Sequence, residues 1–474
     1  MKQNQKTNFR WVMCALLFAA TTINYLDRQV LSLTFEEFIK PEFHWTDAHY
    51  GTITAVFSLC YAIFMLFAGR LIDWLGTKKG YTWAIGVWSA GACLHAVCGL
   101  VTRYGTGLES SAALLQATGD TAVLVATVSL WAFLVARCVL AFGEAGNFPA
   151  AIKVTAEYFP KKDRAFATSV FNSGASIGAL VAPLTIPPLA KHFGWEMAFV
   201  IIGSLGFVWA GCWVFLYDEP RRSRFVSKGE LEYIESDKMA DDAAFHPEEE
   251  VKKGVSIWKC FTYRQTWSLI AGKGLTDGVW WFFLFWTPSY LKAQFDINTS
   301  DPKGMMLIFT LYAIVMLSLL GGKLPTLIIR RTGWDPYRSR MLAMLLFAFF
   351  PLCVLLAQPL GQYSPWWPIL LIGVGCAAHQ SWSANIFSTT GDMFPKPWIA
   401  TVTGIGGMAG GIGSFFIQKG AGNLFTYADE VQMHFLGYVG KSAGYEIAFI
   451  VCSVAYLLAW LIMKALVPKY RPVV

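Results

Sequence analysis

The sequence predicts an all-α membrane protein with twelve transmembrane helices in two pseudo-symmetric six-helix bundles. Three observations predict this fold class: long apolar blocks recur along the chain, charged residues are few, and the two halves share short similar segments. Of the 474 residues, 55% are hydrophobic and 15% are charged, whereas a soluble domain carries about 25% charged residues. The blocks have the length of about 20 residues that an apolar helix needs to cross a bilayer.

Twelve apolar blocks are the candidate spans, taken in order along the chain: 11–33, 48–68, 81–101, 122–150, 165–190, 196–217, 266–291, 304–327, 340–359, 367–390, 399–420 and 444–466. A polar break divides them into six and six. The expected domains are an N-terminal bundle at 1–217, a cytoplasmic central loop at 218–262 and a C-terminal bundle at 263–474. The first block lacks a clear cleavage site, so we expect a retained helix.

The connecting loops alternate between basic and acidic or weakly charged segments, and the positive-inside rule places the basic loops and both termini in the cytoplasm. The halves also resemble each other: residues 194–199 match 444–449, and residues 159–161 match 394–396. An extra polar loop at 421–443 would explain why the two offsets differ. Two parallel six-helix repeats around a central substrate site are a known plan of secondary transporters.

Four charged residues lie inside apolar blocks of the first half: Asp27, Arg28, Arg137 and Glu144. A charged side chain at mid-membrane costs roughly 3 kcal/mol on insertion scales, so such residues usually have a function. They predict a polar cavity between helices and the transport of a charged molecule.

Other classes of protein fit the sequence less well. The net charge of +7 comes from short loops between apolar blocks, which argues against nucleic acid as a partner. Nine of the ten cysteines lie in apolar blocks with no metal-ligand spacing, so we expect packing residues and no metal site. No catalytic triad, paired acids or cofactor fingerprint stands out in the loops, so we expect neither an enzyme nor a bound cofactor.

The loop at 69–79 reads Gly-Arg-Leu-Ile-Asp-Trp-Leu-Gly-Thr-Lys-Lys and resembles the signature loop of the major facilitator superfamily. The resemblance implies that Gly69 lets two helices approach closely and that Asp73 helps to latch one conformation. A basic residue usually follows this aspartate in the family, whereas this chain has Trp74.

Three further stretches resemble the anion:cation symporter family. They are Asn-Tyr-Leu-Asp-Arg at 24–28, the Arg137 to Pro149 segment with Gly-Glu-Ala-Gly-Asn-Phe-Pro at its end, and Ala-His-Gln-Ser-Trp-Ser-Ala-Asn at 378–385. The last stretch is similar to the hexuronate and sugar-acid transporters of that family. The resemblance covers the chain apart from inserts near 103–120 and 421–443.

A sugar acid needs one firm positive contact, and the planar fork of an arginine can bind both carboxylate oxygens. The resemblance assigns this contact to Arg28; the alternative is that Arg28 only neutralises Asp27 or another acid. It also implies that Asp27 and Glu144 carry protons. Arg137 is a further candidate substrate contact. It lies two turns from Glu144 on nearly the same helix face, so these two could approach; the alternative is a static pair.

Further polar side chains are candidate substrate contacts. Family likeness makes Tyr25 and Tyr61 contacts, although each could be an interfacial aromatic. In the tenth span Asn385 is a better candidate than Gln380, and His379 could line the cavity or only pack.

Three other features bear on the site. Lys273 and Asp277 are four residues apart, which favours a structural ion pair. Ala175 and Met65 stand where sugar-acid relatives often carry glutamine, so the bound anion could be smaller or less hydroxylated on that side. Glycines crowd the eleventh span between 404 and 413, which predicts close helix packing.

The expected function is therefore proton-coupled symport of an organic anion by alternating access, with a hexuronate such as glucuronate or galacturonate as substrate. The open alternatives are another organic anion, such as an aldonate or a smaller carboxylate, and a non-transporting membrane sensor with residues 218–262 as its output. We expect a monomer in a bacterial inner membrane, whose partners are the anion, protons and the lipid bilayer.

Overall fold

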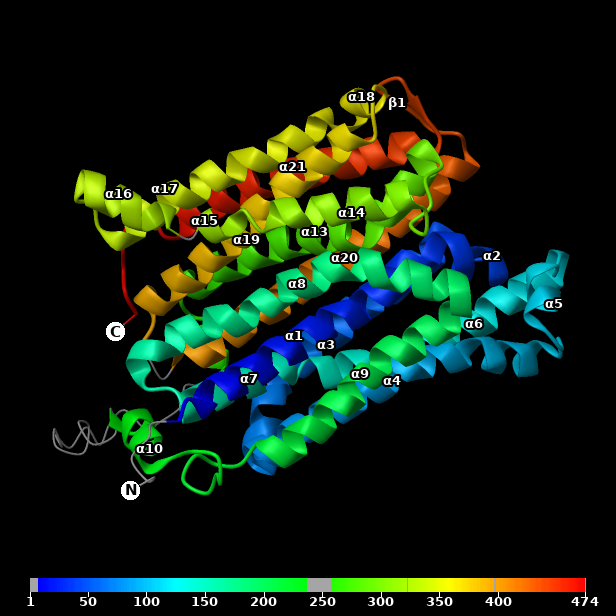
Figure 1. Ribbon diagram of the computed structural model, residues 1–474. Helices are drawn as coiled ribbons and strands as arrows, with labels where there is room; N and C mark the ends of the chain where they lie inside the picture. Colours follow the sequence, from blue (N-terminus) through cyan, green and yellow to red (C-terminus); the bar gives the residue numbers. More distant parts are fainter. Residues whose placement is uncertain (1–6, 237–256, 322, 396–397, 474) are drawn as a thin grey trace.

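The computed structural model describes residues 7–236, 257–321, 323–395 and 398–473, and these are almost entirely helical (Figure 1). Long helices lie side by side, with the first half of the chain forming one group and the second half the other. One short hairpin is the sole β structure in the described ranges.

The first half begins with a helix that continues through a π-helical turn. Its elements, in order, are α1 (Phe9–Thr34), η1 (Phe35–Ile39), α2 (Lys40–Glu42), α3 (Asp47–Leu75), α4 (Thr77–Thr106), α5 (Ser111–Leu115), α6 (Gly119–Glu144), α7 (Asn147–Tyr158), α8 (Lys161–Phe193) and α9 (Trp195–Leu216). Each predicted span of this half therefore has its helix, except that 122–150 runs from α6 across a turn at Ala145 and Gly146 into α7. Most helices run past the apolar block into polar residues.

The interval expected as a central loop contains α10 (Lys228–Ile234) and α12 (Ile257–Cys260), while 237–256 lies outside the described residues. The short helix α10 folds back onto the start of α1. The buried Glu230 carboxylate accepts hydrogen bonds from the backbone N–H groups of Phe9 and Arg10 and forms an ion pair with the Arg10 guanidinium at 3.1 Å. These contacts satisfy N–H groups that have no partner within the helix.

The second half is less regular. Its elements, in order, are α13 (Arg264–Phe295), α14 (Pro302–Val315), α15 (Ser318–Gly321), α16 (Leu324–Thr332), α17 (Pro336–Phe349), η2 (Phe350–Leu356), α18 (Ala357–Gly361), α19 (Trp366–Met393), α20 (Ile399–Glu430), β1 (His434–Phe435), β2 (Tyr438–Val439) and α21 (Lys441–Leu466). The span expected at 304–327 is therefore wrong as one helix. Helix α14 ends at Val315, and α16 begins at Leu324 with Pro325 in its first turn, where the missing N–H of proline is tolerated.

Eight helical segments of the described residues are long and apolar enough to cross a membrane, and they match the predicted spans one to six, nine and twelve. Spans seven, ten and eleven correspond to α13, α19 and α20, with 32, 28 and 32 residues. These lengths suffice for about 30 Å of hydrocarbon. Their lower hydropathy comes from polar residues and glycines, which are tolerated where a helix is covered by protein.

The elongated molecule has two ends (Figure 1). The helices α1 and α13 begin at one end, where α19 and α21 finish, and we call it the terminal end. The last segment of the chain lies there: the Val473 N–H donates to the Met393 carbonyl, and the Gln265 side chain donates to the Arg471 carbonyl. The opposite end, with α2, α5, α18 and the β1–β2 hairpin, is the hairpin end.

Glycines bring α20 close to helices of both halves, as the sequence predicts. A Cβ atom at Gly413 would lie 1.8 Å from the Gly274 carbonyl oxygen in α13, and one at Gly411 would lie 2.4 Å from the Ala62 Cβ in α3. No side chain fits at such distances, so α20 packs against the first half through bare backbone.

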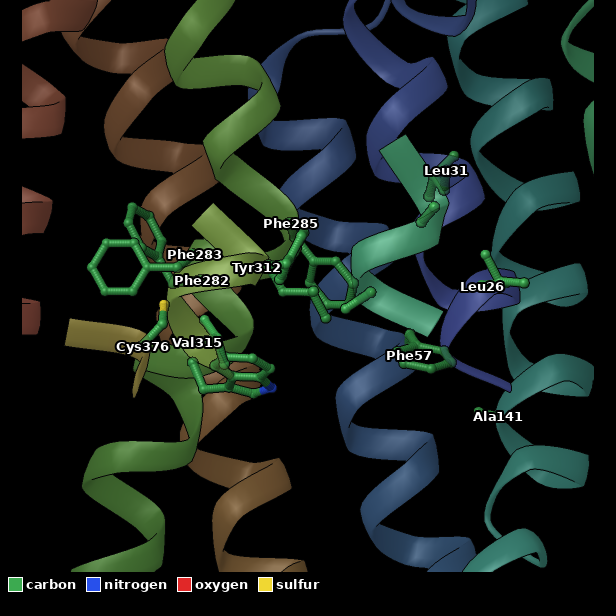
Figure 2. Close-up of a cluster of buried hydrophobic side chains, with 14 of the residues drawn as sticks. Leu26, Leu31, Phe57, Ala141, Phe282, Phe283, Phe285, Tyr312, Val315 and Cys376 are labelled. Atoms are coloured by element: carbon green, nitrogen blue, oxygen red, sulfur yellow. The ribbon is translucent and has the colours of Figure 1, made fainter. Parts of the chain in front are cut away.

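An apolar cluster fills the interior between the halves. Figure 2 shows Phe285 and Tyr312 from the second half on one side and Phe57 and Leu26 from the first half on the other, with Leu26 beside the helix that carries Ala141. The ring centroids of Phe57 and Phe285 are 6.4 Å apart, in an edge-to-face arrangement. The charged residues described next are therefore embedded in an apolar surrounding, which strengthens their electrostatic interactions.

Candidate functional site

Arg28 and Glu144 form a buried ion pair between α1 and α6. The Arg28 Nε atom donates to the Glu144 Oε2 atom at 2.6 Å, and the two side chains are 4% and 0% exposed. Spacing along α6 left open a pair between Glu144 and Arg137, whereas the ion-pair partner of Glu144 comes from another helix. The stability of an ion pair this short and buried depends on both charges, because removing one leaves the other buried and unpaired.

Close helix packing positions this pair. A Cβ atom at Gly143 would lie 2.2 Å from the Trp88 backbone nitrogen, so α6 touches α4 immediately before Glu144. On the other side, a Cβ atom at Gly178 of α8 would lie 2.5 Å from the Thr22 carbonyl oxygen of α1. These contacts fix α1 and α6 between their neighbours and hold the two charged groups at hydrogen-bond distance.

Aromatic rings surround the Arg28 guanidinium. Its carbon lies 4.6 Å from the ring centroid of Tyr61, 5.2 Å from Tyr25, 5.1 Å from Trp281 and 5.9 Å from Phe57. These distances allow cation–π attraction. The structure thus brings Tyr25 and Tyr61 to Arg28, as expected. Phe57 and Trp281 were not predicted, because an aromatic residue in a span looks the same in sequence whether it faces lipid or a cation.

Arg137 and Asp27 lie in the same region and are less well paired. Arg137 is 1% exposed, and its three guanidinium nitrogens have no hydrogen-bond partner among the described residues; its carbon lies 5.2 Å from the Phe57 ring centroid. Asp27 is also buried, and neither of its oxygens meets the geometric limits of a hydrogen bond, with the Trp88 indole as the neighbouring donor. Buried groups of this kind are normally satisfied by a partner or a ligand.

A narrow cavity of about 10 Å³, enough for one water molecule, lies beside this cluster, between the two halves. Its lining residues come from five helices, α1, α8, α13, α14 and α19: Tyr25, Ala175, Ser176, Ala179, Trp280, Tyr312, Val315 and Gln380. Ala175, the position where relatives often carry glutamine, is therefore at the cavity. Met65 lies elsewhere, with its sulfur 3.1 Å from a Cβ placed on Gly407.

The three candidates on α19 differ in placement. Gln380 lines the cavity. The His379 ring stacks on Trp280 with centroids 5.6 Å apart, and its Nδ1 lies 2.8 Å from the Tyr456 hydroxyl, which agrees with a packing role. The Asn385 amide donates at 2.8 Å to the Ser381 carbonyl of its own helix. Gln380 is thus better placed than Asn385, the reverse of the order expected.

The expected pair of Lys273 and Asp277 on α13 is confirmed, with Nζ 2.8 Å from Oδ2. Both side chains are largely buried, at 7% and 16% exposure.

The signature loop lies at the terminal end. The Asp73 carboxylate accepts from Lys153 of α7 at 2.7 Å, within the first half. A Cβ atom on Gly69 would meet no atom of the described residues within 4 Å. The close helix approach expected at Gly69 is therefore absent from this conformation.

Charged side chains join the two halves at the hairpin end. Lys441, at the start of α21, lies 2.9 Å from the Asp47 carboxylate and 3.6 Å from Glu36, and Lys40 lies 3.0 Å and 3.1 Å from the same two acids. We call these four residues the hairpin-end clamp. Beside it, Thr299 donates to the Leu33 carbonyl at 2.7 Å.

Comparisons with known proteins agree with this architecture. The family model described as Major Facilitator Superfamily matches residues 17–417. The hexuronate transporter of Escherichia coli (strain K12) is 29% identical over 419 residues, covering 88% of this chain and 87% of that protein. The galacturonate transporter of Dickeya chrysanthemi is 30% identical over 319 residues, covering 67% and 82%.

Solved structures agree in fold. A crystal structure of a D-xylose–proton symporter matches with a TM-score of 0.67 at 15% identity, covering 98% of each chain. A bacterial homologue of the human lysosomal transporter Spinster, inward-facing and occupied, matches with a TM-score of 0.65 at 17% identity, covering 98% and 97%. The family match, the helical architecture and the relatives together show that this chain is a membrane-spanning transporter, not an enzyme, and that it belongs to the Major Facilitator Superfamily.

Proposed function

We propose that this protein is a proton-coupled symporter of an organic anion, with a hexuronate such as glucuronate or galacturonate as substrate. The observation that carries the proposal is the buried cluster of two arginines and two acids, in which only Arg28 and Glu144 are paired. Arg137 is a cation without a hydrogen-bond partner among the described residues, in a position to attract an anion. The relatives described above, named as hexuronate and galacturonate transporters, support the substrate class.

The coupling follows from the Arg28–Glu144 pair. While Glu144 is ionised, it occupies the Arg28 guanidinium at 2.6 Å. A proton on the carboxylate removes the negative charge, which weakens this bond and frees the guanidinium for the carboxylate of the substrate. Protonation and anion binding then favour each other, as reciprocal linkage requires. Asp27, which lacks an ideal hydrogen bond, is the second proton carrier in this scheme.

The other groups supply orientation. Arg137 adds positive potential, Tyr25 and Tyr61 offer hydroxyl groups beside Arg28, and Gln380 offers an amide from the second half. A sugar acid held between these groups would contact both halves at once, which is what rocking of two bundles about one site requires. In this scheme His379 and Asn385 support α19, and Gly69 and Asp73 act in the conformation that closes the terminal end.

We propose further that the terminal end is cytoplasmic and that the protein lies in a bacterial inner membrane. The basic loops at this end support the orientation through the positive-inside rule. In this scheme the domains are residues 1–217 and 263–474, joined by the cytoplasmic segment 218–262.

Uptake of labelled D-glucuronate and D-galacturonate into proteoliposomes at imposed pH gradients tests the proposal. We expect accumulation above the external concentration when the interior is alkaline, and collapse of the gradient of substrate after a protonophore. Uptake that stops when the internal and external substrate concentrations are equal would show that transport is not coupled to protons. Binding of a sugar acid with no uptake at any gradient would favour a sensor, and uptake of only aldonates or smaller carboxylates would correct the substrate.

A further inference from the structure

The second half contains a buried cation, Lys273, that forms an ion pair with one acid, Asp277. Lys273 Nζ lies 2.8 Å from Asp277 Oδ2, 3.4 Å from the Ser383 hydroxyl and 4.5 Å from the Phe387 ring centroid. The other Asp277 oxygen is buried and has no hydrogen-bond partner among the described residues. The pair therefore resembles Arg28–Glu144: one close contact in a low-dielectric setting, with hydrogen-bonding capacity left over.

Lys273 and Asp277 lie on the same face of α13 as the tryptophans beside Arg28, but further along the helix from Arg28. Residues three and four apart share one face of a helix, and Trp280 and Trp281 follow Asp277 at these spacings. Trp281 lies under the Arg28 guanidinium, and Trp280 lines the cavity beside Tyr25. Four residues correspond to about 6 Å along the axis. Asp277 therefore lies about one turn from the Arg28 site, and Lys273 one turn further toward the terminal end.

The neighbouring helix α19 continues the same surface. Gln380 lines the cavity, and Ala384 and Phe387 follow at helical spacing in the direction of the terminal end. Both are exposed, and Phe387 lies against Lys273. At the hairpin end, in contrast, the clamp joins the two halves. Because the clamp closes the hairpin end, an anion released from Arg28 would move toward the terminal end, the direction in which Asp277 and Lys273 lie.

One comparison within the chain argues against a purely structural pair. The Asp277 carboxylate packs against the backbone of α20, where a Cβ atom on Gly410 would lie 2.2 Å from Oδ2. Helix α13 also carries Lys292 and, at its C-terminal cap, Asp296, an ion pair of identical spacing whose side chains are 34% and 86% exposed. A lysine–aspartate pair at this spacing forms on α13 without burial, so burial of Lys273 and Asp277 has another reason.

We propose that Lys273 is a second anion-binding position for the transported carboxylate on its way between Arg28 and the terminal end, with Asp277 as its counter-ion when no substrate is present. This inference rests on the proposed function. An ammonium group is a compact charge on a flexible stem that rotates its donors freely. It therefore exchanges one carboxylate for another more readily than the fixed fork of an arginine, which suits a position that the substrate must leave.

The test compares Lys273→Gln, Asp277→Asn and the double variant in proteoliposomes containing the full chain. The matched control is Lys292→Gln combined with Asp296→Asn, which removes an exposed pair from the same helix. Three quantities are measured for each: the melting temperature, the equilibrium affinity for D-galacturonate, and the KM and maximal rate of galacturonate counterflow.

We expect Lys273→Gln to lower the maximal rate about tenfold, the loss expected for one charged contact, while equilibrium affinity at the Arg28 site changes little. Asp277→Asn leaves Lys273 without its counter-ion, so the anion is held longer there: both KM and the maximal rate fall. The double variant, which has no unpaired charge, should regain melting temperature and still transport slowly. The control should behave as the unmodified protein.

A structural role gives the opposite result for the double variant, because neutralising both partners together restores folding and hence transport. Counterflow at the unmodified rate in the double variant, or losses in the single variants that follow only the amount of folded protein, would overturn the inference. If the unmodified protein moves no sugar acid, the proposed function itself fails. If it moves one and Lys273→Gln matches it, only the second anion position fails.

Discussion

Replacing Glu144 by glutamine separates the role of its charge from the role of its shape. Glutamine keeps an oxygen that can accept from the Arg28 Nε atom, which lies 2.6 Å from the Glu144 carboxylate, but it carries no negative charge. The variant is therefore a mimic of the protonated state. In the scheme above, it frees Arg28 for the substrate at every pH and removes one of the protons that binding takes up.

The size of the effect follows from the bond that the substrate no longer has to displace. Hydrogen bonds to charged groups contribute about 1.5–3 kcal/mol, and 1.4 kcal/mol is tenfold in a binding constant. At a pH where Glu144 is ionised in the unmodified protein, we therefore expect roughly 10- to 150-fold tighter binding of a hexuronate by Glu144→Gln. Affinity of the unmodified protein should rise as pH falls, and this dependence should weaken by one proton in the variant.

Binding is measured by isothermal titration of purified protein with D-galacturonate across a pH series, with counterflow and gradient-driven uptake on the same preparations. We expect Glu144→Gln to retain exchange and lose proton-driven accumulation. Glu230→Gln is the matched control, because Glu230 is a buried acid paired with Arg10 at 3.1 Å, far along the chain from the site. It should lower the melting temperature without altering affinity or its pH dependence.

If Glu144→Gln binds hexuronate no more tightly than the unmodified protein at high pH, ionised Glu144 does not compete with the substrate for Arg28. If the variant accumulates substrate at the unmodified level, Glu144 has no part in coupling. A fall in melting temperature alone decides nothing between these outcomes, because removing one partner of a buried pair costs about 3–5 kcal/mol whatever its role.

Three further substitutions address other parts of the account. Arg28→Ala should abolish hexuronate binding by titration while leaving a folded protein; retained affinity would mean that another cation holds the carboxylate. Asp27→Asn should keep exchange and reduce the accumulation ratio in a pH gradient; an unchanged ratio would leave Glu144 as the only carrier. Asp47→Asn removes the carboxylate nearest to Lys441 in the hairpin-end clamp and should open this end more often. A cysteine introduced by Thr299→Cys should then react several-fold faster with a membrane-impermeant maleimide. An equal rate of reaction would show that the clamp does not hold this end closed.

The order and position of the helices follow from the apolar blocks, because burial in lipid imposes a simple length and composition on each span. The apolar blocks do not predict where a helix ends or breaks. The helix α3 reaches Leu75 and α20 reaches Glu430, beyond the predicted limits of 68 and 420, because polar residues continue a helix outside the hydrocarbon layer. The 421–443 insert likewise contributes the end of α20 and the β1–β2 hairpin.

The charged members of the candidate site were predictable from the sequence, whereas their pairings and the aromatic neighbours Phe57 and Trp281 were not. The cost of intramembrane charge points to Arg28 and Glu144 without any structure. Spacing along one helix, however, identifies only neighbours on that helix: it gave the correct partner for Lys273, four residues from Asp277, and suggested Arg137 for Glu144. The observed partner of Glu144 comes from α1 and depends on helix packing at glycines.

Proton uptake on substrate binding reports directly whether anion binding and protonation of Glu144 are coupled. Purified protein is titrated with D-galacturonate in buffers of different ionisation enthalpy, so that the heat reports how many protons enter with each anion. The account predicts net uptake of about one proton per anion at pH values where Glu144 is ionised, and less uptake by Glu144→Gln. Saturable binding with no proton uptake at any pH at which the protein stays folded would contradict it.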